Sequence, residues 1–118
     1  TAIRDFAFSE DVAESMMLAV EKQIYKPINL GSGRGHTIKE IVESIISYFD
    51  NNIEIIWDKS KPQGDAKRIM DVKRAKSFGI ELKTPIKEGI HKTIKWFISN
   101  QNNKKINERY NSFKEFDQ

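Results

Sequence analysis

The chain has 118 residues, of which 38% are hydrophobic and 31% are charged, and its formal net charge is +3. This length suffices for one compact domain and not for two. Charges of both signs are mixed along the chain, which argues against a nucleic-acid partner, and the lack of cysteine excludes disulfides and thiolate chemistry. No apolar run is long enough to cross a bilayer, so we expect no membrane partner.

The N-terminal part of the chain predicts a strand followed by a helix. Residues 3–8 alternate in part between apolar and polar side chains, as a strand does. Ser9 is a suitable N-cap, and the two acidic residues after it suit the positive end of a helix dipole. We therefore expect a helix from Ser9 to about Lys22.

The next segment combines a short strand, a glycine-rich turn and a helix start. Residues 28–30 predict the strand, which leads into the turn at 31–35. Dinucleotide-binding loops lie at such a position, but His36 stands where their fingerprint needs a third glycine. The pattern favours a tight turn with positive φ over a cofactor site. Thr37 and Glu40 form a capping box that begins the next helix.

A further strand is predicted at residues 53–57, and a charged loop follows at 61–71. Pro62 and Gly64 disfavour helix and strand in the first half of this loop. The loop gathers three cations and two carboxylates, which is typical of a phosphate-binding loop, although a solvated polar loop is the alternative. These charged residues are Lys61, Asp65, Lys67, Arg68 and Asp71.

Two helices complete the pattern. Asp71 is expected to cap the first, which ends before Gly79, and Thr84-Pro85 begins the second. The tail contains Tyr110 and Lys114 at the spacing of a dehydrogenase acid/base pair, but it is polar, and we assign this pair no catalytic role.

Strands and helices thus alternate, which favours an α/β fold with few short strands and about four helices. Such a thin sheet indicates part of a larger fold. Trp57, Trp96 and Phe97 are expected in the core. Neither His36 nor His91 has a partner at metal-ligand spacing, so we predict no metal site.

The order of these motifs resembles the C-terminal portion of the extended short-chain dehydrogenase/reductases of the NAD(P)-dependent nucleotide-sugar epimerase/dehydratase family. The resemblance spans residues 3–99. Residues 60–64 and 67–72 are most similar to the GDP-L-fucose synthases, whereas Gly64-Asp65 resembles the UDP-sugar epimerases and decarboxylases. The matching segments are Arg4-Asp-Phe, Asp11-Val-Ala, Ile28-Asn-Leu-Gly-Ser-Gly33, Thr37-Ile-Lys-Glu40, the loop at 61–71 and residues 82–97.

This resemblance implies a Rossmann-type parent enzyme that is cytoplasmic, uses NADP or NAD, and transfers a hydride at a sugar carbon. It implies that residues 1–99 are the substrate-binding portion and 100–118 a polar tail. We expect a fragment that lacks the N-terminal cofactor domain, contains no catalytic or cofactor-binding residue, and is inactive alone. The alternatives are a UDP-sugar epimerase, dehydratase or decarboxylase portion, and a non-catalytic nucleotide-sugar or protein binding module.

The resemblance also implies a substrate site. Arg4 corresponds to an arginine that contacts the substrate pyrophosphate, a role that suits a guanidinium. Asp65 is expected to accept hydrogen bonds from ribose hydroxyls or from Arg4. Residues 28–30 would form a free sheet edge, which favours a homo-oligomer. The complete predicted substrate site is Arg4, Gln63, Asp65, Lys67 and Arg68.

Overall fold

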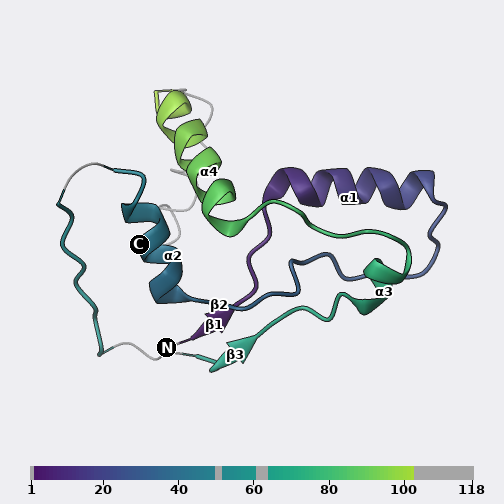
Figure 1. Cartoon of the computed structure of the whole chain (residues 1–118), viewed down its shortest axis with the longest axis horizontal. Coiled ribbons are helices and arrows are strands. Elements are labelled where there is room, and N and C mark those ends of the chain that lie inside the picture. Colours follow the sequence, from purple (N-terminus) through teal and green to yellow (C-terminus); the bar gives the residue numbers. More distant parts are fainter. Residues whose placement is uncertain (1, 50–51, 61–63, 103–118) are drawn as a thin grey trace, which may run out of the picture.

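The computed structural model describes residues 2–49, 52–60 and 64–102. These residues form a small α/β unit with four helices and a three-stranded mixed sheet (Figure 1), which confirms the predicted fold class. The elements follow one another as β1 (Ile3–Arg4), α1 (Ser9–Glu21), β2 (His36–Thr37), α2 (Ile38–Ile46), β3 (Lys67–Arg68), α3 (Lys73–Ser77) and α4 (Ile86–Asn100).

The sheet has β1 at its centre, with β2 and β3 on either side. The β1–β2 pair is antiparallel and aligns Arg4 with His36, whereas the β1–β3 pair is parallel and aligns Arg4 with Arg68. Backbone hydrogen bonds from Ile3 N to Ala66 O (2.9 Å) and from Asp5 N to Arg68 O (3.1 Å) hold the parallel pair. The sheet therefore brings Arg4 beside the second half of the charged loop.

Two of the three predicted strands are wrong. Residues 28–30 and 53–57 lie in irregular segments, and strands form instead at 36–37 and 67–68. Figure 1 shows residues 52–60 as an arm on the outer side of α2, without a neighbouring strand. A strand needs a pairing partner, and apolar composition alone does not supply one. Because residues 28–30 form no strand, the sheet edge expected to favour self-association is not there.

The first predicted strand is shortened, and the start of α1 is displaced. Only Ile3–Arg4 of the predicted 3–8 segment pairs with neighbouring strands. Phe8, rather than Ser9, occupies the N-cap position of α1, and its apolar side chain makes no capping hydrogen bond. The helix persists to Glu21, in agreement with the predicted end near Lys22.

The sequence predicted the ends of the later helices more accurately than the start of α1. The Thr37 hydroxyl accepts from Glu40 N (3.1 Å) while Thr37 N donates to the Glu40 carboxylate (2.7 Å), which confirms the capping box. Gly79 follows α3 with φ +75°, as expected beyond a helix end. Val72, not Asp71, is the N-cap residue of α3, but the Asp71 carboxylate still accepts from Lys73 N at 3.0 Å.

The start of α4 is held by a residue distant in sequence. Pro85 occupies its N-cap position, and Thr84 donates through both its backbone N–H (2.8 Å) and its hydroxyl (2.6 Å) to the carboxylate of Asp11 on α1. Further along, α4 packs against α2, where His91 Nε2 lies 3.2 Å from both the Ser47 hydroxyl and the Ser44 carbonyl oxygen. The two contacts tie α4 to both other long helices.

The buried core of the described residues is small. Ala75 and Ile80, in and just after α3, are the only buried hydrophobic residues in these ranges. Trp57, Trp96 and Phe97 were expected in the core, but each is about half exposed, so that prediction is wrong. Much apolar surface therefore remains uncovered. Within the described ranges, no helix has the length and apolar character needed to traverse a bilayer.

Candidate functional site

The structure places Arg4 on the central strand, with its side chain against the start of β3. One guanidinium nitrogen, Nη1, donates to the carbonyl oxygens of Asp65 and Ile3, both at 2.8 Å. The predicted contact between Arg4 and Asp65 therefore exists, but it uses the backbone of Asp65 rather than its carboxylate. Because Nη1 is held by two acceptors, the orientation of the whole planar guanidinium is fixed.

Asp65 and Arg68 lie together beside Arg4. The Asp65 carboxylate is 3.6 Å from Arg68 Nε, and both side chains are more than two-thirds exposed, so this ion pair is weak. Lys67 is exposed and aligns with Ile3 in the β1–β3 register. Gln63 lies outside the described residues. Arg4, Asp65 and Arg68 thus form one patch with two cations and one carboxylate, which we call the β1–β3 patch, whereas the alternation of side chains along β3 directs Lys67 to the other face of the sheet.

Gly64 leaves room beside this patch. Its φ is +65°, and a Cβ built at this position would lie 3.6 Å from Nη2 of Arg4. Nη1 of Arg4 is engaged by protein carbonyls, whereas Nη2 faces this open position. Among the described residues Nη2 has no hydrogen-bond acceptor, and a glycine here leaves room for a ligand to approach this edge of the guanidinium.

Asp5 is the organising residue that sequence reasoning missed. Its carboxylate accepts from Ser32 N (2.9 Å), Gly33 N (2.9 Å) and Met70 N (3.2 Å), as well as from the Ser32 hydroxyl. One side chain thereby fastens the glycine-rich turn and the segment after β3 to β1. The only signal for it in the sequence was its place next to Arg4 in the Arg-Asp-Phe motif.

The glycine-rich turn is a tight turn, as the sequence favoured. Gly33 has φ +66°, and a Cβ at Gly31 would lie 2.7 Å from the Cβ of Met70. Consecutive backbone amides in such a turn bind an anion readily. Here the amides of Ser32 and Gly33 both donate to Asp5, so the protein's own carboxylate takes the place of an external anion.

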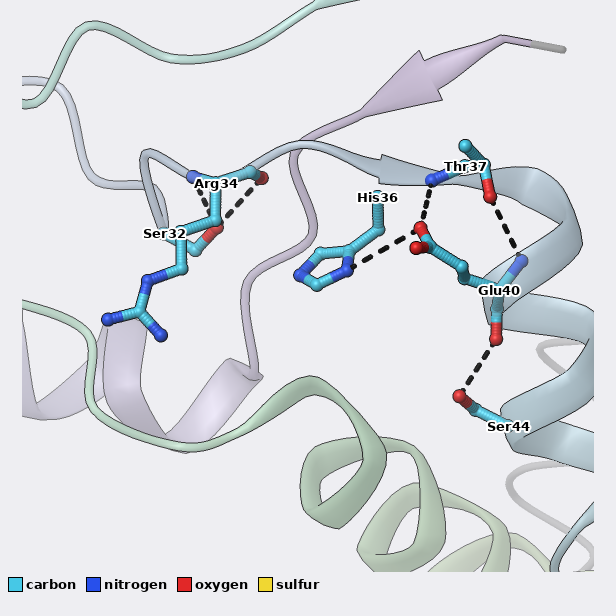
Figure 2. Close-up of polar contacts among 6 residues, drawn as sticks. All are labelled: Ser32, Arg34, His36, Thr37, Glu40 and Ser44. Atoms are coloured by element: carbon cyan, nitrogen blue, oxygen red, sulfur yellow. Dashed lines mark hydrogen bonds and ion pairs between the residues drawn. The ribbon is translucent and has the colours of Figure 1, made fainter.

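A second group of polar residues follows that turn (Figure 2). The Ser32 hydroxyl accepts from Arg34 N (3.1 Å) and lies 3.2 Å from Arg34 O, which pins the backbone from which the Arg34 side chain leaves. His36 Nδ1 lies 3.9 Å from the Glu40 carboxylate. The hydrogen bond from Thr37 N is the main reason that the pKa of Glu40 lies below its ordinary value.

Arg34 and His36 border a cleft of about 580 Å³ between the β1–α1 connection and α4. The cleft is distinct from the β1–β3 patch, since no residue of that patch lines it. In the described ranges, no group of three or more His, Cys, Asp or Glu side chains is arranged to hold a metal ion.

No family model matches the chain. Curated relatives do. It is 31% identical over 99 residues to a protein named probable GDP-L-fucose synthase 1 from Oryza sativa subsp. japonica, covering 83% of this chain and 30% of that protein. It is 26% identical over 111 residues to GDP-L-fucose synthase of Escherichia coli K12, covering 86% and 35%. The chain thus spans about a third of the length of these relatives.

Solved structures give the same picture. The UDP-glucose 4-epimerase of Thermotoga maritima, determined with UDP-glucose, superposes with a TM-score of 0.70 at 26% identity, over 86% of this chain and 33% of that one. The dTDP-glucose 4,6-dehydratase of Bacillus anthracis, determined with NAD, gives 0.66 at 23% identity over 85% and 32%, a likeness of fold. The chain is therefore homologous to part of the NAD-dependent epimerase/dehydratase proteins.

Proposed function

We propose that residues 1–99 are the substrate-binding portion of an NAD(P)-dependent enzyme that modifies a nucleotide sugar, and that the parent is a GDP-L-fucose synthase-like epimerase/reductase. The observation that carries this proposal is the β1–β3 patch. It holds the guanidinium of Arg4 in a fixed orientation beside a second cation, Arg68, and the exposed carboxylate of Asp65.

The chemistry of the patch suits a nucleoside diphosphate. A pyrophosphate carries at least two negative charges on oxygens spaced for a planar guanidinium, and Arg4 presents its Nη2 edge toward the open position at Gly64. Arg68 adds positive charge from the neighbouring strand, where it is aligned with Arg4. The Asp65 carboxylate is exposed and pairs only loosely with Arg68, so it is free to accept hydrogen bonds from ribose hydroxyls.

The described residues do not fit a dinucleotide cofactor. The two turn amides that would hold a phosphate donate to Asp5, and His36 stands where the fingerprint needs glycine. We therefore assign binding of NADP or NAD, and the hydride and proton transfers, to other parts of the parent enzyme, and propose that this chain is inactive alone. Tyr110 and Lys114 lie outside the described residues.

A UDP-sugar enzyme is the second candidate. The structural match to a UDP-glucose 4-epimerase favours it, as does 31% identity over 98 residues to a putative UDP-glucose 4-epimerase of Methanocaldococcus jannaschii. Gly64-Asp65 is the point at which the chain resembles the UDP-sugar enzymes. The same patch would then grip the pyrophosphate, and only the base would differ. A homo-oligomeric parent stays a prediction.

Calorimetric titration of the chain with a GDP-sugar and a UDP-sugar tests the proposal. We expect saturable binding at one site, with the GDP-sugar bound more tightly. Tighter binding of the UDP-sugar would favour the second candidate. Inorganic pyrophosphate is the control, because it presents two linked phosphates without base or sugar. If neither nucleotide sugar binds more tightly than pyrophosphate, the substrate-binding proposal is wrong.

A further inference from the structure

We propose that the cleft between the β1–α1 connection and α4 binds a small organic anion with an apolar body. Its volume of about 580 Å³ lies in the range of ligand pockets, roughly 300–1,000 Å³. This site goes beyond the proposed function, because the β1–β3 patch contributes no residue to it.

The walls of the cleft are apolar and come from three elements. The β1–α1 connection contributes two aromatic rings, α2 contributes one isoleucine, and the segment leading into α4 and α4 itself contribute the rest. An aromatic or aliphatic body placed between them removes apolar surface from water on both sides, which is worth about 25 cal/mol per Å². The wall residues are Phe6, Phe8, Ile45, Leu82, Ile86, Ile90 and Ile94.

One end of the cleft is positively charged. Arg34 and His36 both border it, and Figure 2 shows their side chains leaving the same stretch of backbone on the same side. The Arg34 side chain has no ion pair with any residue that the structure describes, and its backbone is pinned through the Ser32 hydroxyl. The guanidinium stays charged at any ordinary pH and offers donors in a planar fork.

The described lining of the cleft includes no Asp or Glu. Three carboxylates lie behind the lining: Asp5 accepts from Ser32, Asp11 accepts from Thr84, and Glu40 lies beside His36. The only cation in the described lining that carries a fixed charge is Arg34, so an anionic group would pair with its guanidinium while the apolar body of the ligand lies against the walls. This combination selects an organic anion over both a neutral apolar compound and a free inorganic ion.

Two fluorescent probes of nearly the same shape test this inference. The first, 1-anilinonaphthalene-8-sulfonate, is anionic, and N-phenyl-1-naphthylamine is its uncharged analogue. We expect the chain to bind the anionic probe saturably at one site. Arg34→Gln should weaken its binding about fivefold, in line with the loss of one partly exposed charge pair. The neutral probe should bind both proteins equally.

Two variants keep the result interpretable. Thr93→Glu places a negative charge on the exposed α4 side of the cleft and should also weaken only the anionic probe. Lys39→Gln removes a cation on α2 that does not line the cleft, and should change neither probe. Non-saturable binding, or equal binding of the anionic probe to wild type, Arg34→Gln and Thr93→Glu, overturns the inference, and so does equal weakening of both probes.

Discussion

Arg4 and Asp5 are neighbours in the sequence, and their side chains hold different segments to the same strand. Arg4 binds the carbonyl of Asp65 at the start of β3, while Asp5 binds the glycine-rich turn and Met70. Both residues are half-buried. A hydrogen-bonded carboxylate in this position stabilises the turn that would otherwise hold unpaired amides. The orientation of the Arg4 side chain therefore depends on Asp5, which holds the glycine-rich turn and the segment after β3 against β1.

Replacing Asp5 with alanine should be strongly destabilising. The change leaves the amides of Ser32, Gly33 and Met70 without their acceptor, and we expect a loss of about 2–3 kcal/mol in the free energy of unfolding. Urea titration followed by circular dichroism, in buffer with a stabilising osmolyte, measures it. Asp58→Ala is the matched control, because within the described ranges the Asp58 carboxylate bonds only to nearby Ser60. An equal effect of the two changes would contradict the role of Asp5.

Glu40 should make the stability of the fold depend on pH in the acidic range. Its folded-state pKa is depressed below the ordinary 4.5, mainly by the hydrogen bond from Thr37 N. The contribution of Glu40 to the free energy of unfolding is therefore complete above pH 4.5, and it is lost as the pH falls through the lower pKa of the folded state. Glu40→Gln keeps an acceptor but does not titrate. The drop in Tm between pH 7 and pH 3 should be smaller in Glu40→Gln than in wild type.

Glu43→Gln is the control for that measurement. Glu43 lies on the same helix and faces Lys39 at 3.7 Å across an exposed surface. Such a pair contributes little. The Tm of Glu43→Gln should fall between pH 7 and pH 3 by nearly as much as the Tm of wild type. If the Tm of Glu40→Gln also falls as much as that of wild type, the capping box does not cause the dependence of stability on pH.

At the scale of elements, local signals in the sequence predicted helices well. The Thr37–Glu40 capping box, Gly79 after α3 and Pro85 at the start of α4 each act within four residues, so the sequence alone reveals them. The Arg-Asp-Phe motif likewise drew attention to Arg4. These features depend on backbone groups that are close in the chain, so the local sequence is sufficient to predict them.

Local sequence patterns do not predict which distant segments pair with one another. β3 joins β1 across more than sixty residues, and Asp11 meets Thr84 across 73. The apolar composition of residues 53–57 predicted a strand, yet no described segment pairs with them, while the charged pair Lys67–Arg68 does form one. Strand formation depends on the partner more than on intrinsic propensity. Asp5 was missed for the same reason, since its acceptor role needs the turn and Met70 in place.

Two glycines with positive φ should respond differently to alanine. At Gly79 a Cβ would meet nothing closer than the Lys22 amine at 3.9 Å, so only backbone strain of about 1 kcal/mol is expected. At Gly33 the same strain applies, and the Cβ would also lie 2.7 Å from a methyl group of Val72. Gly33→Ala should therefore lower the free energy of unfolding by about 2 kcal/mol or more. Urea titration in buffer with a stabilising osmolyte measures the free energy of unfolding of both variants. A larger loss in Gly79→Ala than in Gly33→Ala would contradict the geometry of the glycine-rich turn.

For the whole molecule, the small core limits stability. Only Ala75 and Ile80 are buried among the hydrophobic residues described, while Met16, Met17 and Val20 on α1 are each at least 60% exposed. A domain normally draws its stability from burying such side chains. The described part of the chain leaves this apolar surface in water, so its net stability should lie below the usual range.

The 118-residue chain should therefore unfold with a free energy below about 5 kcal/mol. Urea titration in plain buffer, followed by circular dichroism and by tryptophan fluorescence, measures this value. Trp57 and Trp96 are both about half exposed, so the fluorescence change should be small as well. A cooperative transition of about 8 kcal/mol or more would mean that the chain buries far more apolar surface than the structure shows.

Calorimetric titration of a GDP-sugar into wild type, Arg4→Lys and Arg4→Ala tests directly the assignment of Arg4 to the substrate site. Arg4 holds the β1–β3 patch in place through two carbonyls and presents its free edge to the ligand. Arg4→Ala should weaken binding about tenfold to a hundredfold, and Arg4→Lys should restore only part of it, since lysine keeps the charge without the planar fork. Lys87→Ala, on the exposed face of α4, is the control. Equal affinity in all four proteins would contradict the assignment of Arg4 to the substrate site.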